Sequence, residues 1–475
     1  MIKNKEITSR DENFAEWFTN IVQKAGVVDY TSVKGFYIMA PNGYAIWENM
    51  QKVLDDMFKK TGHKNIYMPM LIPESLLLKE KEHIEGFAPE VAWVTQGGAN
   101  KLEEKLCIRP TSETLFCDYY SKIVKSYRDL PKLYNQWCSV VRWEKETRPL
   151  LRGREFLWQE GHTIHATEQE AKEETLRMLN VYRDFFVNYL AIPVLVGQKT
   201  EKEKFAGAEN TYTCEALMYN GVCLQSATSH YFGQKFAKAF DMKFLDKDNK
   251  LKYVYQTSWG ITTRALAATI MVHGDDNGLV LPPMIAPTKV VIIPIGKDEN
   301  IAKICKNVCK KLEDNNISCI LDDSDKSPGF KFSQYEMEGV PLRIELGKRD
   351  YENGKITLVR RDTQEGMQIN LDEDILKAVE TTLKTIQKDM LERATQRCEK
   401  MTYTAKSLKD FEEIISSHPG FIKAMWCGDI NCEEKIKKIN GIKSRCIPFK
   451  QEQLDEKCAC CGKKAKHMVV WGIQY

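Results

Sequence analysis

The sequence contains no run of about 18 apolar residues, so we expect no membrane-spanning helix. Its first residues, 1–6, lead into charged positions without the apolar core of a secretory signal, which argues against export. The formal net charge is only +3, so the chain has no global basic field, and any contact with nucleic acid must come from local patches. We therefore predict a cytoplasmic protein that has no membrane partner.

Two common nucleotide-binding signatures are also absent. The chain has neither Gly-x-x-x-x-Gly-Lys-Ser/Thr nor Gly-x-Gly-x-x-Gly, which excludes those two modes of phosphate binding. It has no internal repeat and no low-complexity tract. A hydrophobic content of 43% and a charged content of 28% are ordinary for a globular protein, and a length of 475 residues predicts more than one domain.

What the chain does have is an unusual density of arginine in segment 142–162. Two flat runs that contain apolar residues, 137–143 and 155–162, flank a charged loop. This pattern predicts two strands joined by a long tip, with Arg142, Arg152 and Arg154 at the tip and its bases. A guanidinium stays charged and holds phosphate or carboxylate through two N–H groups, so the hairpin fits a polyanion. Judged by arginine density alone, a basic hairpin that is simply solvated is the alternative to a hairpin that binds a polyanion.

The hairpin resembles motif 2 of the class II aminoacyl-tRNA synthetases, and its second strand resembles that of the prolyl-tRNA synthetases. Three further blocks follow the order in which that family carries them along the chain, and the block that begins at Trp259 resembles motif 3. The four blocks are Phe156-Leu157-Trp158-Gln159-Glu160-Gly161-His162, Pro110-Thr111-Ser112-Glu113, Gln225-Ser226-Ala227-Thr228-Ser229-His230 and Trp259-Gly260-Ile261-Thr262-Thr263-Arg264. The His-Ile-Gly-His and Lys-Met-Ser-Lys-Ser signatures of class I are absent. Segment 167–208, mainly helical in pattern, has no room for the bacterial editing insertion, so the chain is identified as a member of the archaeal/eukaryotic-like type.

The N-terminal part predicts a helix over 11–25, a second helix after 41–43 and a strand over 65–73 that is bounded by prolines. The second helix and this strand resemble motif 1, which implies a homodimer. An ordinary core helix and edge strand is the alternative, because proline in a strand usually marks a sheet edge. Between 100 and 283, short β runs predict a mostly antiparallel sheet, and an apolar helix is expected over 265–272.

After a linker at 281–287 the pattern changes to alternating strands and helices, which indicates a small α/β domain. We expect strands at 290–293, 318–321 and 342–346, helices at 299–313 and 331–338, a hairpin turn at 352–354 and a helix over 371–398. The predicted fold class is therefore α+β. A class II catalytic domain on an antiparallel sheet spans 1–285, an α/β anticodon-binding domain spans 286–398, and a small α+β zinc-binding domain spans 399–475.

The resemblance implies that L-proline and ATP with Mg²⁺ form prolyl-adenylate, and that proline then passes to tRNA(Pro). Two anions must meet in this reaction, so fixed positive charge at the reacting centre is the main requirement. The catalytic residues implied are Arg142, which bridges carboxylate and α-phosphate, and Arg264, which clamps the γ-phosphate. The implied ATP contacts are Arg142, Glu144, Arg152, Gly153, Gln225, Thr228, Thr262 and Arg264, with Gln225 also at Mg²⁺. Gly153 departs from the threonine of human-like relatives, so a hydroxyl contact is lost there.

A proline pocket needs apolar walls and acceptors for two N–H groups. Phe156, Trp158, Glu160 and His162 alternate along one strand, so we expect them to face the same side. Plain core packing is the alternative for the two larger rings. The residues that the resemblance assigns to proline are Thr111, Glu113, Arg142, Phe156, Trp158, Glu160, His162 and His230.

The family likeness also places residues that read the proline anticodon at Glu336, Arg343, Arg349 and Asp350, although ordinary surface charge is the alternative. In some members the C-terminal residue turns back toward the catalytic domain, which implies the same for Tyr475.

Fifteen cysteines in a reducing compartment should mostly be buried apolar residues, but two close pairs stand out. We predict that Cys427, Cys432, Cys458 and Cys461 bind a structural Zn²⁺, because four thiolates leave no open position. Cys460 could replace Cys461 as a ligand, and Cys446 is a bystander candidate. The alternative to a zinc site is that these cysteines are reduced and free.

Two rival functions remain open at this point. One is a sister synthetase for threonine, serine or glycine, which pyrophosphate exchange across amino acids would separate from a prolyl enzyme. The other is a non-catalytic paralogue that only binds RNA or regulates. The joint presence of Arg142, Arg152, Gln225 and Arg264 argues against the second, because a binding module has no need of them all.

Overall fold

The computed structural model describes residues 7–83 and 90–475; the charged start at 1–6, used above to argue against export, lies outside them. The chain is built around an 11-stranded sheet in the order β20-β21-β23-β22-β9-β10-β11-β14-β8-β7-β3. Six consecutive strands of this sheet pair antiparallel, which confirms the predicted α+β class and antiparallel sheet. They are β9 (Val194–Gln198), β10 (Asn210–Leu217), β11 (Cys223–Gly233), β14 (Tyr255–Thr262), β8 (Glu155–His165) and β7 (Lys132–Val141).

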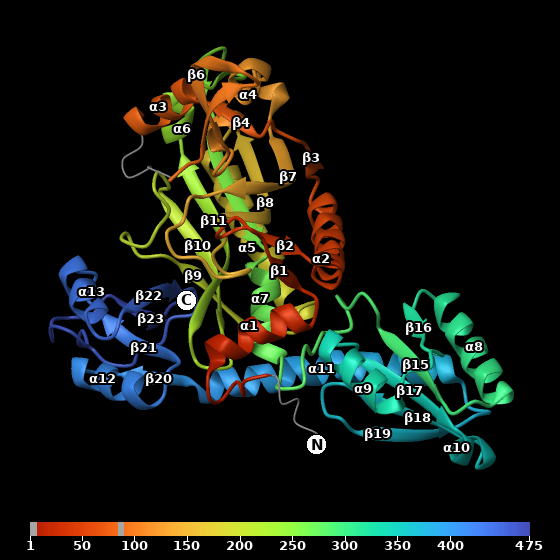
Figure 1. Cartoon of the computed structure of the whole chain (residues 1–475). Helices are drawn as coiled ribbons and strands as arrows, with labels where there is room; N and C mark the ends of the chain where they lie inside the picture. The colour runs from red at the N-terminus through yellow and green to blue at the C-terminus, as the bar shows by residue number, and fades with distance from the viewer. Residues whose placement is uncertain (1–6, 84–89) are drawn as a thin grey trace.

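One face of this sheet is covered by helices (Figure 1). The largest is α5 (Glu168–Asn188), which packs against β8, β10, β11 and β14. Met178, Tyr182 and Phe185 recur at helical spacing and are fully buried, while Thr167 and Glu170 form a capping box at its start. Segment 167–208 is thus helix only in its first half. The other helices of this part are α1 (Phe14–Lys24), α2 (Pro41–Lys60), α3 (Glu74–His83), α4 (Glu113–Ile123), α6 (Lys235–Ala239) and α7 (Arg264–His273).

The continuous strand predicted over 65–73 is wrong, because the structure divides it. β3 (Lys64–Asn65) is the edge of the large sheet, and β4 (Leu71–Pro73) is the edge of a three-stranded sheet with β6 (Asn100–Ile108) and β5 (Trp93–Gly97). The ladder stops because the Met68 N–H donates to the Gln136 side chain at 2.9 Å, and Pro69 has no N–H to donate. Both pieces are edges, as proline in a strand suggests.

The expected α/β part follows the linker. β16 (Cys319–Leu321), β15 (Val290–Ile295) and β17 (Leu342–Gly347) are parallel, and β18 (Lys355–Arg360) and β19 (Gly366–Asn370) continue the sheet antiparallel. Its helices are α8 (Glu299–Glu313) and α9 (Pro328–Glu338). The predicted 352–354 turn is not a tight hairpin, because α10 (Lys348–Glu352) comes between β17 and β18 and the turn only closes that helix.

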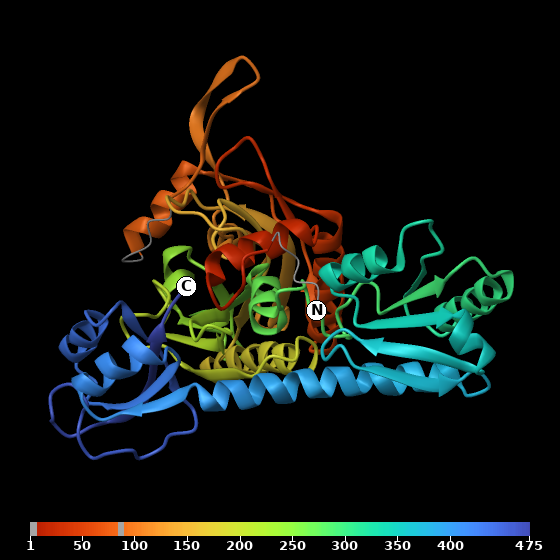
Figure 2. The same cartoon turned by 60° about the horizontal axis from the view of Figure 1, so that its bottom comes forward.

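A single long helix, α11 (Ile375–Lys400), runs beneath the N-terminal part and joins the α/β part to the last segment (Figure 2). That segment contains β20 (Thr402–Ala405), α12 (Leu408–Ser417), β21 (Phe421–Trp426), α13 (Ile430–Lys437), β22 (Ile442–Pro448) and β23 (His467–Ile473). β22 pairs with β9 through Ile447 and Pro448, so the C-terminal strands continue the sheet of the N-terminal part. Within the described ranges, no helix is both long and apolar enough to span a bilayer.

Candidate active site

A cavity of about 310 Å³ opens over β8, β11 and β14 and is lined by charged residues of both signs. Strand register orders them: Trp158 lies opposite Thr262, Glu160 opposite Gly260, and His162 opposite Ser258. Arg264 follows the Thr262 end of β14, four positions beyond the Glu160 row and six beyond Ser258. The Glu160 row and Thr262, the last residue of β14, are two positions apart, or about 6–7 Å at about 3.3 Å per residue, so the strand separates a carboxylate end from an arginine end.

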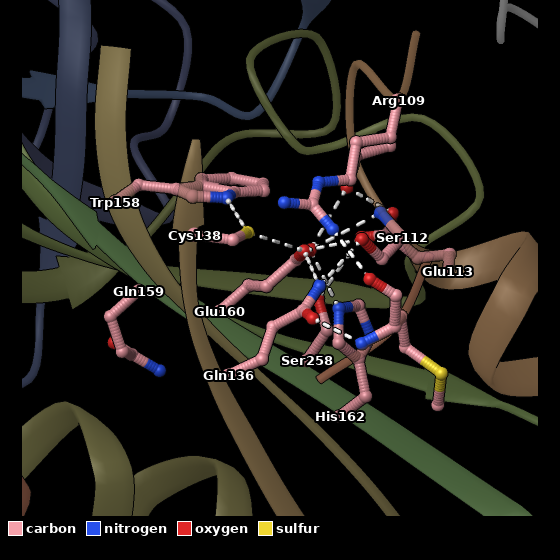
Figure 3. A network of polar contacts seen from close by, with 12 residues as sticks. Arg109, Ser112, Glu113, Gln136, Cys138, Trp158, Gln159, Glu160, His162 and Ser258 are labelled. Carbon is pink, nitrogen blue, oxygen red and sulfur yellow. Dashed lines mark hydrogen bonds and ion pairs between the residues drawn. The ribbon is translucent and has the colours of Figure 1, made fainter. Parts of the chain in front are cut away.

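At the carboxylate end, Glu160 is held most closely by four donor groups (Figure 3). The Ser112 hydroxyl donates at 2.5 Å and its backbone N–H at 3.2 Å, the Gln136 amide donates at 2.6 Å, and His162 Nε2 lies at 2.9 Å. Burial works to raise the pKa of Glu160, but His162, Ser112 and Gln136 outweigh it and hold this pKa below its usual range. Beside it, Thr111 donates to Glu113 through a short hydrogen bond.

His162 does not line the cavity, in contrast to the expectation that it joins Phe156, Trp158 and Glu160 there. Its ring stacks on Phe116 with centroids 4.3 Å apart, and it holds Glu160 from behind. Burial works to lower the pKa of His162, but its bond to Glu160 prevails and raises it. His162 thus contacts the carboxylate that lines the cavity.

His230 does line the cavity, and its ring packs against the ring of Phe205 with centroids 4.7 Å apart. Its Nδ1 lies 3.0 Å from the Thr211 hydroxyl. Burial lowers the pKa of His230 to about 3, so the ring is neutral at pH 7. The other predicted proline residues, Thr111 and Glu113, also line the cavity.

The arginine end holds two partly buried guanidinium groups. Arg142 donates from Nε to the Pro110 carbonyl at 3.0 Å and lies 5.5 Å from each of the Phe156 and Trp158 ring centroids. Arg264 donates to the Leu151 carbonyl at 3.0 and 3.3 Å. Burial lowers the pKa of Arg264 to about 10, and Arg142 and Arg152 nearby add to this effect. Like charges this close favour an anion between them.

The hairpin tip reaches this end through an unusual backbone. Leu150 has a φ of +61°, which is rare for a residue with a branched side chain and which turns the Leu151 carbonyl toward Arg264. A Cβ on Gly153 would lie 2.3 Å from the Tyr37 hydroxyl and 2.7 Å from the Glu155 carbonyl. Tyr37 therefore fills the space that any side chain at position 153 would need.

Every residue predicted to contact ATP lines this one cavity, and their individual contacts with ATP remain predictions. Reasoning from the sequence missed several lining residues: Leu150, Leu151, Glu203, Phe205, Thr211 and Ser258. Only the pairing of β10 with β11, which sets Thr211 opposite His230, could have pointed to Thr211. The loop that supplies Glu203 and Phe205 has no motif that marks it.

The four residues predicted to read an anticodon lie in the α/β part, at α9, β17 and α10. Arg343 donates to Glu336 at 2.9 Å and to Glu345 at 2.7 Å, and its guanidinium stacks on Phe332 at 4.1 Å. Arg349 is exposed, and Asp350 accepts weak bonds from Thr357 and Gln368 at 3.3 Å each. Glu345, which the sequence did not single out, occupies part of the Arg343 fork.

The four predicted zinc ligands come together as Cys427, Cys432, Cys458 and Cys461, with sulfurs within 4.8 Å of one another. Two of the sulfur pairs, Cys427–Cys432 and Cys427–Cys461, are each 3.7 Å apart. A tetrahedron with Zn–S bonds of about 2.3 Å has edges of about 3.8 Å, so the set fits zinc. The backbone N–H of Lys463 lowers the pKa of Cys461 to about 7, which favours the thiolate. Cys460 and Cys446 are outside this group.

The last residue turns back toward the 11-stranded sheet, as the family likeness implied. The Tyr475 backbone N–H donates to the Cys223 carbonyl at 3.2 Å, and Asn220 donates to the Tyr475 hydroxyl at 3.1 Å. Tyr475 also lines a smaller cavity with Arg148, Arg152 and Arg264. The C-terminus therefore lies beside the arginine end.

Comparison with known proteins gives three family matches. Residues 93–273 match "tRNA synthetase class II core domain (G, H, P, S and T)", residues 289–381 match "Anticodon binding domain", and residues 408–475 match "Prolyl-tRNA synthetase, C-terminal". The chain is 60% identical over 471 residues to a proline--tRNA ligase of Ruminiclostridium cellulolyticum, covering 99% of this chain and 98% of that protein. A proline--tRNA ligase of Clostridium novyi is also 60% identical, and "Proline--tRNA ligase 2" of Bacillus cereus is 56% identical, each with the same coverage. The core match alone is shared by synthetases for several different amino acids. The C-terminal match and these relatives point to proline among them.

Proposed function

The chain belongs to the prolyl-tRNA synthetases, class II enzymes of the archaeal/eukaryotic-like type, and from this premise we propose how its residues divide the work of proline--tRNA ligation. The observation that carries the proposal is one cavity with carboxylates at one end and guanidinium groups at the other. Proline carries an ammonium and a carboxylate, and ATP carries a polyanion. A dipolar cavity of this kind orients both substrates before they react.

At the carboxylate end, Glu160, Glu113 and Thr111 accept the N–H groups of proline, while Phe156 and Trp158 pack on its ring. His162 supports Glu160, and His230 closes the wall as a neutral ring. The proline carboxylate then points toward Arg142, which also meets the α-phosphate. Support comes from the position of Arg142, whose charge interacts with both Glu113 and Glu160 and which lines the same cavity as Arg264.

At the arginine end, Arg264 and Arg152 hold the outer phosphates, and Glu144 takes the adenine end of ATP. Gln225, Thr228 and Thr262 line the nucleotide side, with Gln225 the position proposed nearest to Mg²⁺, and Gly153 contributes backbone only. Mg²⁺ binds oxygen ligands and neutralises charge on the phosphates when ATP is bound. In-line attack of the proline carboxylate on the α-phosphate forms the adenylate and releases pyrophosphate.

Proline-dependent exchange of pyrophosphate into ATP tests the function directly. We expect exchange with proline and only background exchange with threonine, serine or glycine. Exchange that responds to one of those three and not to proline would overturn the assignment of the cavity.

The cavity should admit alanine and cysteine, because it can exclude larger side chains by contact but not smaller ones. Each missing methylene is worth roughly 1–3 kcal/mol, so we expect kcat/KM for alanine roughly 10² to 10⁴ times below that for proline. The chain has no editing insertion between α5 and β10 to remove the product in cis. Alanine-stimulated conversion of ATP to AMP without tRNA measures this, and hydrolysis at background level would contradict it.

We propose that tRNA(Pro) is read at its anticodon by Glu336, Arg343, Arg349 and Asp350, and that Zn²⁺ fills the cysteine cluster. The proposed role of Arg343 is supported by its position above the Phe332 ring, because a guanidinium held over a ring can stack beside an unpaired base. The bound zinc supplies a closed, structural cross-link between the Cys427–Cys432 and Cys458–Cys461 segments. The proposed domain boundaries remain 1–285, 286–398 and 399–475, and the proposed location is the cytoplasm.

A homodimer is the proposed assembly, and large apolar side chains near the motif 1 strand support it. Tyr67, Met70, Leu71 and Trp93 are 66%, 44%, 38% and 44% exposed, on or next to the three-stranded sheet. We expect Leu71→Glu to shift the sedimenting species from dimer to monomer, because it buries a charge in the interface. Leu251→Glu, which changes an apolar residue 69% exposed on β13 (Leu251–Tyr253), is the matched control and should stay dimeric. An unchanged Leu71→Glu dimer would place the interface elsewhere.

A further inference from the structure

The loop between β9 and β10 forms part of the cavity wall through Glu203 and Phe205. Phe205 packs on His230, and its backbone N–H donates to the Thr211 hydroxyl at 2.9 Å. The inner side of this loop, residues 199–208, therefore faces the carboxylate end, where proline is proposed to bind.

The base of the same loop is held by residues more than 200 positions later in the chain. The Thr200 hydroxyl donates to Glu433 Oε1 at 2.8 Å, and the Ser444 hydroxyl donates to the same oxygen at 2.5 Å. Glu433 is buried, and so are both hydroxyls. Next to this bond, Lys202 forms an ion pair with Glu434. Buried hydrogen bonds to a charged group are among the stronger ones, so this contact fixes the loop base.

The preceding loop residue is anchored in the same region. Lys199 lies 2.7 Å from Glu215 of β10, and Arg445 of β22 approaches the other oxygen of Glu215 at 3.3 Å. All three side chains have 0–1% exposure. The loop base is therefore enclosed between the catalytic sheet and the C-terminal strands, where β22 pairs with β9.

The two carboxylates of the C-terminal part that hold the loop, Glu433 and Glu434, both belong to α13, and α13 also carries Cys432; Ser444 of β22 lies 3.1 Å from the Thr200 hydroxyl as well. Cys432 is one of the four clustered cysteines and immediately precedes Glu433. Whatever fixes the Cys432 sulfur also fixes the helix turn from which Glu433 and Glu434 reach the loop. The cysteine cluster and the cavity wall are thus connected by one short helix.

We propose that Glu433 is a positioning residue for the amino-acid end of the cavity. It connects the 199–208 loop to the cysteine cluster. Metal bound in the cluster therefore fixes the positions of Glu203 and Phe205 at the cavity wall, where the substrate binds. The effect on proline, though not the tie itself, rests on the function proposed above.

The test compares Glu433→Ala with Glu433→Gln in pyrophosphate exchange. Loss of the acceptor should raise KM for proline about tenfold and leave KM for ATP and kcat within about twofold. Gln keeps an oxygen acceptor for Thr200 and should restore most of the proline affinity. Thr200→Val removes the partner hydroxyl and should produce the same KM rise, with no further rise in the double variant. Lys435→Ala, on an exposed position of the same helix, is the control and should match the wild type.

Limited trypsin digestion gives a readout independent of activity, because Lys202 and Lys204 lie in the loop. Cleavage there should be several-fold faster in Glu433→Ala than in the wild type, with the zinc content of both unchanged. Removing zinc from the wild type with a chelator should also accelerate cleavage in the loop. In Glu433→Ala, removing zinc should change the cleavage rate little.

Unchanged proline KM and unchanged cleavage in metal-loaded Glu433→Ala would overturn the proposal. If Glu433→Ala does not fold, Thr200→Val decides by the same two measurements. A wild type without proline-dependent exchange would instead overturn the proposed function, and the trypsin comparison would still test the tie.

Discussion

Arg142→Ala should abolish measurable prolyl-adenylate formation while leaving the protein folded. We expect kcat/KM for proline-dependent pyrophosphate exchange to fall by at least about 10³-fold, since the group meets charge that develops between two anions. Arg142 is suited to this role because its charge interacts with Glu113 and Glu160 and also with Arg264, and all four line one cavity. Among the residues that the structure describes, the guanidinium makes one hydrogen bond, to the Pro110 carbonyl, and can donate its remaining N–H groups to ligands.

Two further variants separate charge from geometry. Arg142→Lys keeps the charge but loses the planar fork and should recover only a small part of the activity. Arg148 belongs to the same hairpin but faces Tyr475 and does not line the main cavity. The exchange activity of Arg148→Ala should therefore stay within a fewfold of the wild type. Circular dichroism and the unfolding midpoint serve as folding controls. A folded Arg142→Ala enzyme that retains a tenth of wild-type exchange would remove Arg142 from the reacting centre.

Much of the site could be predicted from sequence because its residues sit in local motifs. Arg142, Phe156, Trp158 and Glu160 lie on one hairpin, and hairpin strands pair with their nearest neighbours in the chain. The cysteine cluster was also predictable, since ligand spacing carries the signal. In both cases the chemistry requires particular residue types at particular spacings.

Other parts depend on contacts that leave no local trace. The 65–73 segment reads as one strand by its pattern, but a side chain of β7 takes the Met68 N–H and ends the ladder. The pairing of β22 with β9 joins segments about 250 residues apart, and neither strand carries a sign of its partner. His162 alternates correctly with Glu160, yet it lies behind the carboxylate because Phe116 stacks on its ring. Periodicity gives the face of a strand, and neighbours decide which residues on that face reach a cavity.

Glu160→Gln should have the second large effect, on both proline binding and stability. The substitution replaces one oxygen by an amide NH₂ in a site where Ser112, Gln136 and His162 all donate or can donate. Two donors then face each other in a buried space, and His162 loses the charge that compensates its burial. Breaking a buried pair costs about 3–5 kcal/mol, and losing a charge-assisted bond to the proline ammonium should raise KM about 10- to 100-fold. Glu155→Gln, at the exposed start of the same strand, is the matched control.

The cost in stability should depend on pH, and the direction follows from the two pKa shifts. The pKa of His162 is raised by Glu160 in the folded wild type, so the pair contributes fully below the unfolded value of about 6.5. This contribution is lost as pH rises through the folded pKa of His162. The pKa of Glu160 is lowered, so its own contribution is lost only as pH falls through that depressed value. In the variant, His162 loses the hydrogen bond and the charge of Glu160, so burial works to lower its pKa and only Glu113 still works to raise it, which makes protonation of His162 cost the fold more than in the wild type. The difference in unfolding free energy between wild type and Glu160→Gln should therefore be largest near pH 5–6 and shrink toward pH 9. Urea unfolding across this range measures it, and a difference that is flat or grows with pH would show that His162 stays neutral beside Glu160 throughout.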